Sequence, residues 1–155
     1  MAGAELFELE ALYRERFRHF VRVATAVVHD EDRAVEAVQE AFAAAVRSRR
    51  AFRRDGPLEA WVWQMVVNAA RKAPRVQAEP LDEFAAEETK EASNVVRTAI
   101  TQLPERQRLA LFLRYYADLD YRSIATALEI SPGTVGASLN AAHATLRRLL
   151  QEVQQ

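Results

Sequence analysis

The sequence predicts an all-α protein of two small helical domains joined by a flexible acidic linker. Apolar residues recur every three or four positions over most of the chain, which is the period of a helix packed along one side. One segment breaks this pattern: residues 74–93 contain two prolines, and six acids stand against one lysine between residues 79 and 91. A polar, acidic segment of this kind buries too little apolar surface to fold alone. The 155 residues therefore divide into expected domains at 1–73 and 94–155.

Helices are expected in the N-terminal domain at residues 5–28 and 33–50, and after Pro57. The first of them has an apolar stripe along one face, made by Leu6, Leu9, Tyr13, Phe17, Phe20, Val21, Ala24 and Val28. An acidic run, residues 29–32, separates the first two helices. An N-cap at Asp30 or Asp32 explains this run better than a metal site, because the run lacks the i, i+4 ligand spacing of a helical site.

The centre of the chain is strongly basic. Between residues 47 and 75, eight lysines and arginines stand against two acids, and both tryptophans lie in this segment. Arginines that neutralise phosphates beside an exposed aromatic ring suit unstacked, single-stranded DNA. Trp61 lies on the apolar stripe of its helix and is expected in the core. Trp63 is expected nearer the surface, either packed there or in contact with a base.

A helix-turn-helix is predicted in the C-terminal domain, after a helix at 94–102 and a scaffold helix that begins at Pro104. Asp120 is a good N-cap for a short helix at 121–128, and Ser131 with Pro132 starts a second helix that runs to about residue 150. Ile130, Val135 and Leu139 are expected to pack between these two helices. A motif of this kind places its second helix in a DNA major groove.

Specific residues resemble a known family. Region 4 of the extracytoplasmic-function sigma factors, the small promoter-recognition subunits of bacterial RNA polymerase, is matched by Leu103-Pro104, Arg108, residues 113–115, Tyr121, Ile124-Ala125, Leu128, Ile130-Ser131 and residues 133–135. Residues 38–42 are similar to sigma region 2.2, which docks on the clamp helices of the polymerase β′ subunit. Residues 60–63 with Met65 and Asn68 resemble regions 2.3–2.4, which capture the melted −10 element. The resemblance implies a sigma factor that binds core RNA polymerase, recognises the −35 and −10 elements and helps to melt promoter DNA.

The resemblance also assigns candidate site residues. Those for polymerase binding are Glu36, Gln39, Glu40 and Phe42, of which Phe42 could serve mainly as core. Those for the −10 element are Arg53, Arg54, Trp63, Asn68, Arg71 and Lys72. Those for the −35 element are Arg122, Thr134, Ser138, Asn140, His143 and Arg147.

The predicted recognition helix departs from the family pattern. Relatives typically follow Gly-Thr-Val with Lys-Ser-Arg, whereas this chain has Gly136, Ala137 and Ser138, and residues 101–155 hold six arginines against five acids. Two accounts stay open: a working sigma factor whose upstream contact relies on shape, or a degenerate accessory factor whose C-terminal module docks on protein. A third, from another class, is a helical protein-interaction module that binds no DNA. Glu129 stands where relatives often have glycine, and it would cost up to about 1 kcal/mol if left-handed.

Several function classes are not expected. The chain has no glycine-rich phosphate loop, no nucleophile elbow and no HExxH motif, so we expect no enzyme. It has no cysteines, so a disulfide or a thiolate metal site is excluded, and we expect no cofactor. No apolar run approaches the roughly 20 residues of a membrane span, which favours a cytoplasmic protein without a membrane partner. The expected partners are core RNA polymerase and promoter DNA; whether an anti-sigma protein also binds is left open.

Overall fold

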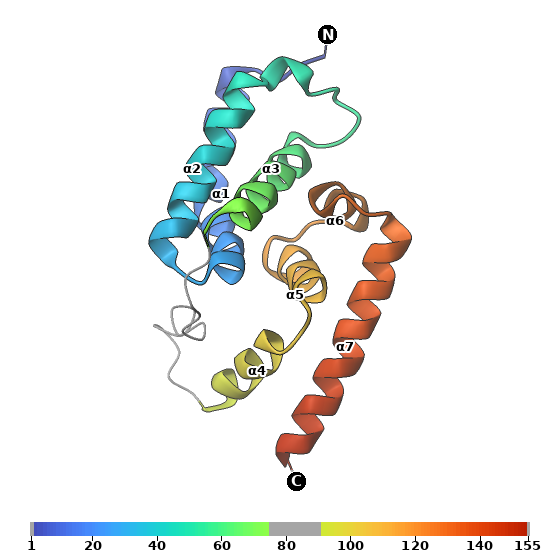
Figure 1. Ribbon diagram of the computed structural model, residues 1–155. Helices are drawn as coiled ribbons and strands as arrows, with labels where there is room; N and C mark the ends of the chain where they lie inside the picture. Colours follow the sequence, from blue (N-terminus) through green and yellow to red (C-terminus); the bar gives the residue numbers. More distant parts are fainter. Residues whose placement is uncertain (1, 75–90, 155) are drawn as a thin grey trace.

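The structure is a computed structural model that describes residues 2–74 and 91–154. Most of the predicted linker, 74–93, lies outside the described residues. Within the described part, all regular secondary structure is helical, which confirms the predicted all-α class (Figure 1). Also within that part, no helix is long and apolar enough to cross a membrane.

Three helices form the N-terminal half. They are α1 (Leu6–Val28), α2 (Glu31–Arg47) and α3 (Leu58–Lys72), with a 3₁₀ turn η1 (Arg49–Ala51) after α2. Asp30 is the N-cap of α2: its Oδ2 accepts a hydrogen bond from the Arg33 backbone N–H at 3.1 Å. One of the two predicted caps is therefore correct. The helix ends three residues before the predicted boundary, because η1 tightens the chain there.

The C-terminal half contains α4 (Glu91–Thr101), α5 (Glu105–Leu111), α6 (Tyr121–Leu128) and α7 (Pro132–Gln154). Asp120 Oδ1 accepts from the Ser123 N–H at 2.8 Å, and Ser131 Oγ accepts from the Thr134 N–H at 3.1 Å. Both predicted caps are confirmed, and α6 and α7 form the predicted helix-turn-helix. Glu129, the C-cap of α6, is left-handed at φ 57°, so the strain expected for a left-handed residue here is present.

A π-helical turn, η3 (Phe112–Tyr116), follows α5 and was not predicted. The Ala117 N–H bonds back to the Phe112 carbonyl at 3.0 Å, the i to i+5 pattern of such a turn. Asp118 follows with a left-handed φ of 62° and turns the chain toward α6. The scaffold helix therefore ends in a widened turn, and the carbonyl of Ala117, directly after it, accepts a hydrogen bond from Arg16.

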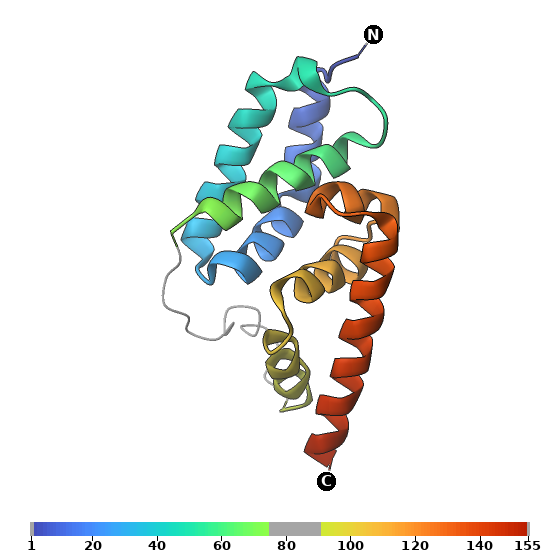
Figure 2. The same ribbon diagram turned by 45° about the vertical axis from the view of Figure 1, so that its right-hand side comes forward.

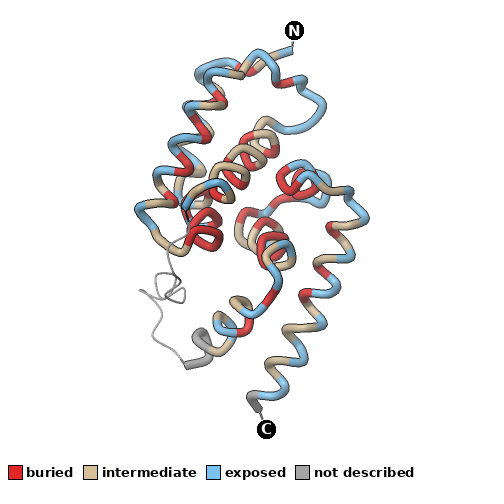
Figure 3. Tube along the Cα trace, viewed as in Figure 1, coloured by how far each residue is buried: buried red, intermediate tan, exposed pale blue. Residues whose placement is uncertain are grey.

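The two halves pack on each other through α3. Figures 1 and 2 show α3 lying across α1 and α2 on one side and against α6 on the other. One buried apolar cluster runs through both halves, and Figure 3 shows buried residues on the facing sides of these helices. Its largest fully buried side chains include Leu9, Phe20, Trp63, Leu109, Leu113, Ile124 and Leu139. Small helical units are marginal alone, and here each half completes its core against the other.

Candidate nucleic-acid interface

The outward face of α2 carries three of the four residues predicted to bind polymerase. Glu36, Gln39 and Glu40 are exposed, and helical spacing brings them to one side of the helix. Glu40 also pairs with Arg47 further along this face at 3.6 Å. Phe42 is different: it is only 7% exposed. Its ring makes edge contacts with Tyr13 and Phe20 at centroid distances of 4.8 and 5.3 Å, so it belongs to the core.

The expectation that Trp63 lies near the surface is wrong. Its side chain is 0% exposed, its ring lies 4.3 Å from that of Phe20, and its indole N–H donates to Glu59 at 3.0 Å. Trp61 is instead the partly exposed ring, and it lies 5.3 Å from Phe52. The reason is that α3 is packed on two sides: Trp63 faces α1, while Trp61 faces the edge of the interface with α6. Trp63 is therefore not available to stack on a base in this arrangement.

The loop before α3 presents two of the predicted cations. Arg53 and Arg54 are both exposed, and Arg54 has a left-handed φ of 60°. Arg54 pairs with Glu8 at the start of α1, with an Nη2–Oε1 distance of 2.5 Å. The hydrogen bond from Arg54 is the main reason why the pKa of Glu8 lies below its ordinary value. The loop is thus fastened to α1 while Arg53 faces solvent.

The C-terminal end of α3 carries the other predicted −10 residues. Asn68 is partly exposed and Lys72 is exposed. Arg71 is partly buried, and its Nε lies 3.0 Å from Glu105 Oε1 at the start of α5. No local sequence pattern indicates this partner, because 34 residues separate the two.

The predicted −35 residues lie on the outward side of α7, on its two flanks and on α6. Asn140 and Arg147 are exposed on the outward side of α7, together with the small residues Ala137, Ala141 and Ala144. Thr134 and Ser138 lie on one flank of this side and His143 on the other, all partly exposed. Arg122 is exposed, but it belongs to α6.

His143 and Arg122 each lie close to other parts of the protein. His143 Nε2 lies 3.0 Å from the hydroxyl of the exposed Tyr115, so this imidazole is positioned by a partner on η3. Arg122 lines a cavity of about 630 Å³ between the two halves, which Arg53, Phe52 and Trp61 also line. The predicted −35 and −10 cations therefore meet at one cavity.

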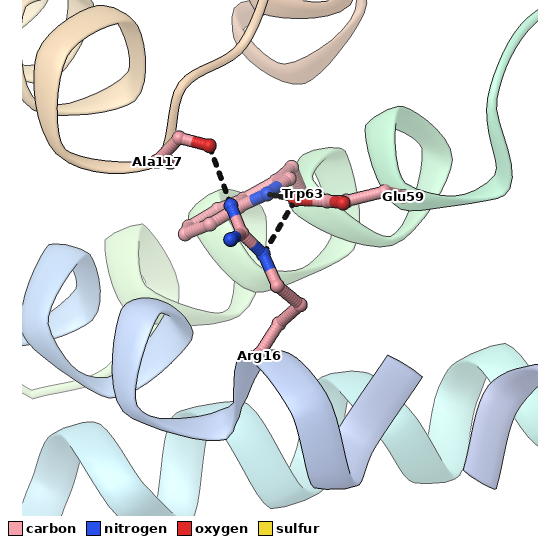
Figure 4. A network of polar contacts seen from close by, with 4 residues as sticks. All are labelled: Arg16, Glu59, Trp63 and Ala117. Atoms are coloured by element: carbon pink, nitrogen blue, oxygen red, sulfur yellow. Dashed lines mark hydrogen bonds and ion pairs between the residues drawn. The ribbon is translucent and has the colours of Figure 1, made fainter. Parts of the chain in front are cut away.

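A polar network that the sequence did not reveal joins the halves (Figure 4). Arg16 on α1 donates to Glu59 on α3 at 3.0 Å and to the carbonyl of Ala117, which lies 101 residues away in the chain. No local pattern predicts such a contact. The one available signal was that Arg16 lies beside the apolar stripe of α1, where an unpaired charge would be costly.

Comparison with known proteins identifies the family. Residues 12–79 match the Sigma-70 region 2 model, and residues 93–151 match the Sigma-70, region 4 model. The RNA polymerase sigma-H factor of Pseudomonas aeruginosa is 29% identical over 147 residues, covering 80% of this chain and 76% of that protein. The ECF RNA polymerase sigma factor SigM of Mycobacterium tuberculosis is 29% identical over 156 residues, covering 96% and 80%.

The chain belongs to the extracytoplasmic-function sigma factors. A solved structure agrees with the fold: the sigma factor RpoE from Bartonella quintana, in complex with the anti-sigma factor NepR, has a TM-score of 0.71 at 18% identity, covering 94% of this chain and 98% of that one. This sigma factor is a promoter-recognition subunit for bacterial RNA polymerase. The comparisons do not favour the alternatives of a degenerate docking protein or a plain interaction module.

Sigma factors are in general initiation factors and not enzymes. Among residues 2–74 and 91–154, no group of three His, Cys, Asp or Glu side chains is placed to hold a metal ion.

Proposed function

We propose that this sigma factor binds core RNA polymerase through Glu36, Gln39 and Glu40 on the outward face of α2. The support is their shared exposure on one helix face, with the buried ring of Phe42 holding that face in place from behind. Two carboxylates and an amide on a rigid helix suit a basic helical partner surface, and oppositely charged surfaces raise the rate of association. The family resemblance names that surface as the clamp helices of β′.

The −10 element is proposed to bind along α3, through Arg53, Arg54, Asn68, Arg71 and Lys72. The 15 residues of α3 span roughly 22 Å, so the loop cations and the C-terminal cations sit at the two ends of one extended track. A single strand along this track has its phosphates neutralised at both ends. Trp61 replaces Trp63 as the ring available to a base, because it is the partly exposed one.

The −35 element is proposed to bind the outward side of α7. Asn140 and Arg147 occupy its centre, Thr134, Ser138 and His143 its flanks, and Arg122 contributes from the neighbouring helix. An asparagine can pair with an adenine edge, and one good base contact supplies about 1–3 kcal/mol of discrimination. The alanines let the helix approach the groove closely, so this contact depends more on shape than on charge.

The domain organisation and the setting are also proposals. We take residues 1–73 and 94–155 as the two promoter-binding domains and 74–93 as their tether. Since the fold is shared with a sigma factor solved with an anti-sigma factor, an anti-sigma protein is a proposed partner of this chain as well. The site of action is the cytoplasm, where polymerase and chromosome are.

Reconstitution with core enzyme tests the proposal. The purified chain should co-purify with bacterial core RNA polymerase and direct run-off transcription from genomic fragments to defined start sites. A Glu36→Lys, Glu40→Lys variant should no longer co-purify, because like charges across the contact repel. The matched control is Glu10→Lys, a reversal at an exposed residue of α1, which should bind normally. Failure of the unaltered chain to bind core, or to start transcription on it, would overturn the proposed function.

A further inference from the structure

The cavity of about 630 Å³ between the two halves lies at the N-terminal ends of α3 and α6. One wall is the loop before α3 together with the first turn of that helix. The opposite wall is α6 and the turn that leads into α7. The volume falls within the roughly 300–1,000 Å³ of pockets that hold small molecules, and the mixture of apolar and polar lining is also typical of them. The proposed function assigns no occupant to this cavity.

Two aromatic rings form part of the cavity wall. The ring centroids of Phe52 and Trp61 lie 5.3 Å apart, with the planes tilted by 41°. Phe52 is only 5% exposed, and the guanidinium of Arg54 lies 5.6 Å from the centre of its ring, so this ring is held in place. Trp61 is partly exposed and lines the cavity. A partly exposed indole beside a fixed ring suits a flat aromatic group, which can stack on it.

Two arginines reach the cavity from different halves. Arg53 comes from the loop before α3, and Arg122 comes from α6. Both are exposed, and within the described residues neither forms an ion pair. A guanidinium binds a phosphate through two parallel hydrogen bonds, so this pair suits a phosphate-bearing ligand.

Promoter DNA does not account for the meeting of these two arginines. Arg53 is proposed to contact the −10 element and Arg122 the −35 element. These elements lie many base pairs apart, and each base pair adds about 3.4 Å to the duplex. One stretch of promoter therefore cannot reach both arginines across a single cavity, whereas a small molecule can.

Oxygen acceptors complete the lining. Asp55 is exposed and, in the part of the chain that the structure describes, forms no ion pair, so its carboxylate can accept hydrogen bonds. Asp120 is already engaged, because it accepts from the Ser123 N–H at 2.8 Å. Thr126 Oγ1 donates to the Arg122 carbonyl at 3.1 Å and keeps its own acceptor capacity. A carboxylate in the position of Asp55 suits ribose hydroxyls, which acidic side chains bind in nucleotide sites.

We propose that this cavity binds a free ribonucleoside phosphate: the base stacks on Trp61, Asp55 accepts from the ribose hydroxyls, and Arg53 and Arg122 hold the phosphate. The aromatic wall, the carboxylate and the two cations correspond to the three parts of this ligand. The ligand engages both arginines, so it competes with promoter phosphates for them. This competition rests on the proposed function, but the binding itself does not.

Titration calorimetry of the full chain tests the binding. The probes are the mono- and diphosphates of adenosine and guanosine, with the two nucleosides and inorganic pyrophosphate as controls. At least one nucleotide should bind about tenfold or more tightly than its nucleoside and than pyrophosphate, because only the nucleotide uses the rings and the cations together. Its 2′-deoxy form should bind more weakly, since Asp55 then lacks one donor.

Substitutions around the cavity locate the site. Arg53→Gln and Arg122→Gln should each weaken nucleotide binding about tenfold or more, through loss of a charge-assisted hydrogen bond. Trp61→Ala should weaken it about fivefold or more. Thr126→Trp, at an exposed position, places a large ring in the cavity and should abolish binding. Arg18→Gln removes an exposed cation of α1 that does not line the cavity, and this matched control should bind normally. Circular dichroism checks that each variant is folded.

Three results would overturn the inference. The first is pyrophosphate binding as tight as that of every nucleotide, since charge alone would then explain it. The second is equal nucleotide affinity in Arg18→Gln and in the two arginine variants of the cavity. The third is no binding of any of the nucleotides, whether or not a short single-stranded DNA binds.

Run-off transcription with core polymerase measures the proposed function separately. If the unaltered chain starts transcription but binds no nucleotide, the inference about the cavity alone is wrong. If it binds a nucleotide in the cavity but starts no transcription, the proposed function and the competition with promoter phosphates are wrong, and the binding site stands.

Discussion

The two regions that we propose to contact DNA differ in charge. The segment from residue 47 to 75, which contains α3 and the loop before it, carries eight cations against two acids. The segment from 101 to 155, which contains the helix-turn-helix, carries six against five. Phosphate contacts dominate raw affinity. We therefore expect the first region to bind DNA mainly through phosphates, and the second mainly through shape and base contacts. We therefore expect the helix-turn-helix to depend on the first region and on polymerase for its affinity more than a cation-rich recognition helix would.

The largest effect on stability should come from the buried tryptophan of α3, in the more basic region. Trp63→Ala removes a fully buried ring and should lower the free energy of unfolding by about 3–5 kcal/mol. Trp61→Ala, at a partly exposed ring, should cost clearly less stability and should instead weaken binding to single-stranded DNA. Urea denaturation of both variants checks the difference. Equal losses of stability would contradict the assignment of Trp63 to the core and Trp61 to the surface.

The next prediction tests whether the cations at the end of α3 bind DNA phosphates. Arg71→Ala with Lys72→Ala should weaken promoter binding by the reconstituted holoenzyme roughly 10- to 100-fold, whatever the sequence. The slope of log K against log salt should become shallower by about 0.9 for each phosphate that is no longer neutralised. Filter binding over a salt series measures both, with Arg14→Ala on α1 as the control cation. An unchanged slope would show that these two residues do not bind phosphates.

A smaller effect is expected from adding a cation to the less basic region. Ala141→Arg places a cation on the outward side of α7, and it should raise duplex binding by less than about tenfold and steepen the salt slope by about 0.9. Asn140→Ala should instead abolish discrimination at one base position while leaving that slope unchanged. Binding to a panel of single-base promoter variants distinguishes the two. An unchanged slope and an unchanged affinity in Ala141→Arg would argue against DNA contact by this side of α7.

The stability of the helix-turn-helix should depend on one cap. Asp120→Ala should cost about 1 kcal/mol, because the Ser123 N–H loses its acceptor. That backbone hydrogen bond is also the main reason why the pKa of Asp120 is lowered from 3.8. The cap therefore contributes fully above pH 3.8 and is lost as pH falls through the lowered folded-state value. Thermal unfolding against pH should show this acid-side loss in the unaltered chain and not in Asp120→Ala.

The smallest effect concerns the stability of the folded protein at mildly acidic pH. Burial, followed by the nearby Arg16 charge, lowers the pKa of His19 from 6.5; Arg22 adds to this, and Glu59 opposes it. The unfolded chain therefore takes up the proton first, so the stability of the folded protein should fall as pH drops below 6.5. His19→Phe keeps a ring against Tyr116 without a titrating nitrogen, and its free energy of unfolding, measured by urea denaturation, should vary less with pH. An identical pH profile in both proteins would exclude His19 as the titrating group.

Local signals made the helix-turn-helix predictable. Asp120 and Ser131 are cap residues whose hydrogen bonds reach only three residues along the chain, so sequence spacing contains the whole interaction. The outward residues of α2 and α7 follow from helical periodicity in the same way. The two tryptophans were harder to place because α3 is covered on two sides, and an apolar stripe then no longer marks which ring is deeper.

The sequence alone determined the helices, their caps, the family and the unequal charge of the two halves, because each of these depends on neighbouring residues or on composition. The tertiary structure decided which tryptophan is buried and which partners Arg16 and Arg71 take. It also decided that α6 packs against α3. Those contacts join residues 34 to 101 positions apart, and their energy comes from desolvation and geometry that exist only after the helices have packed.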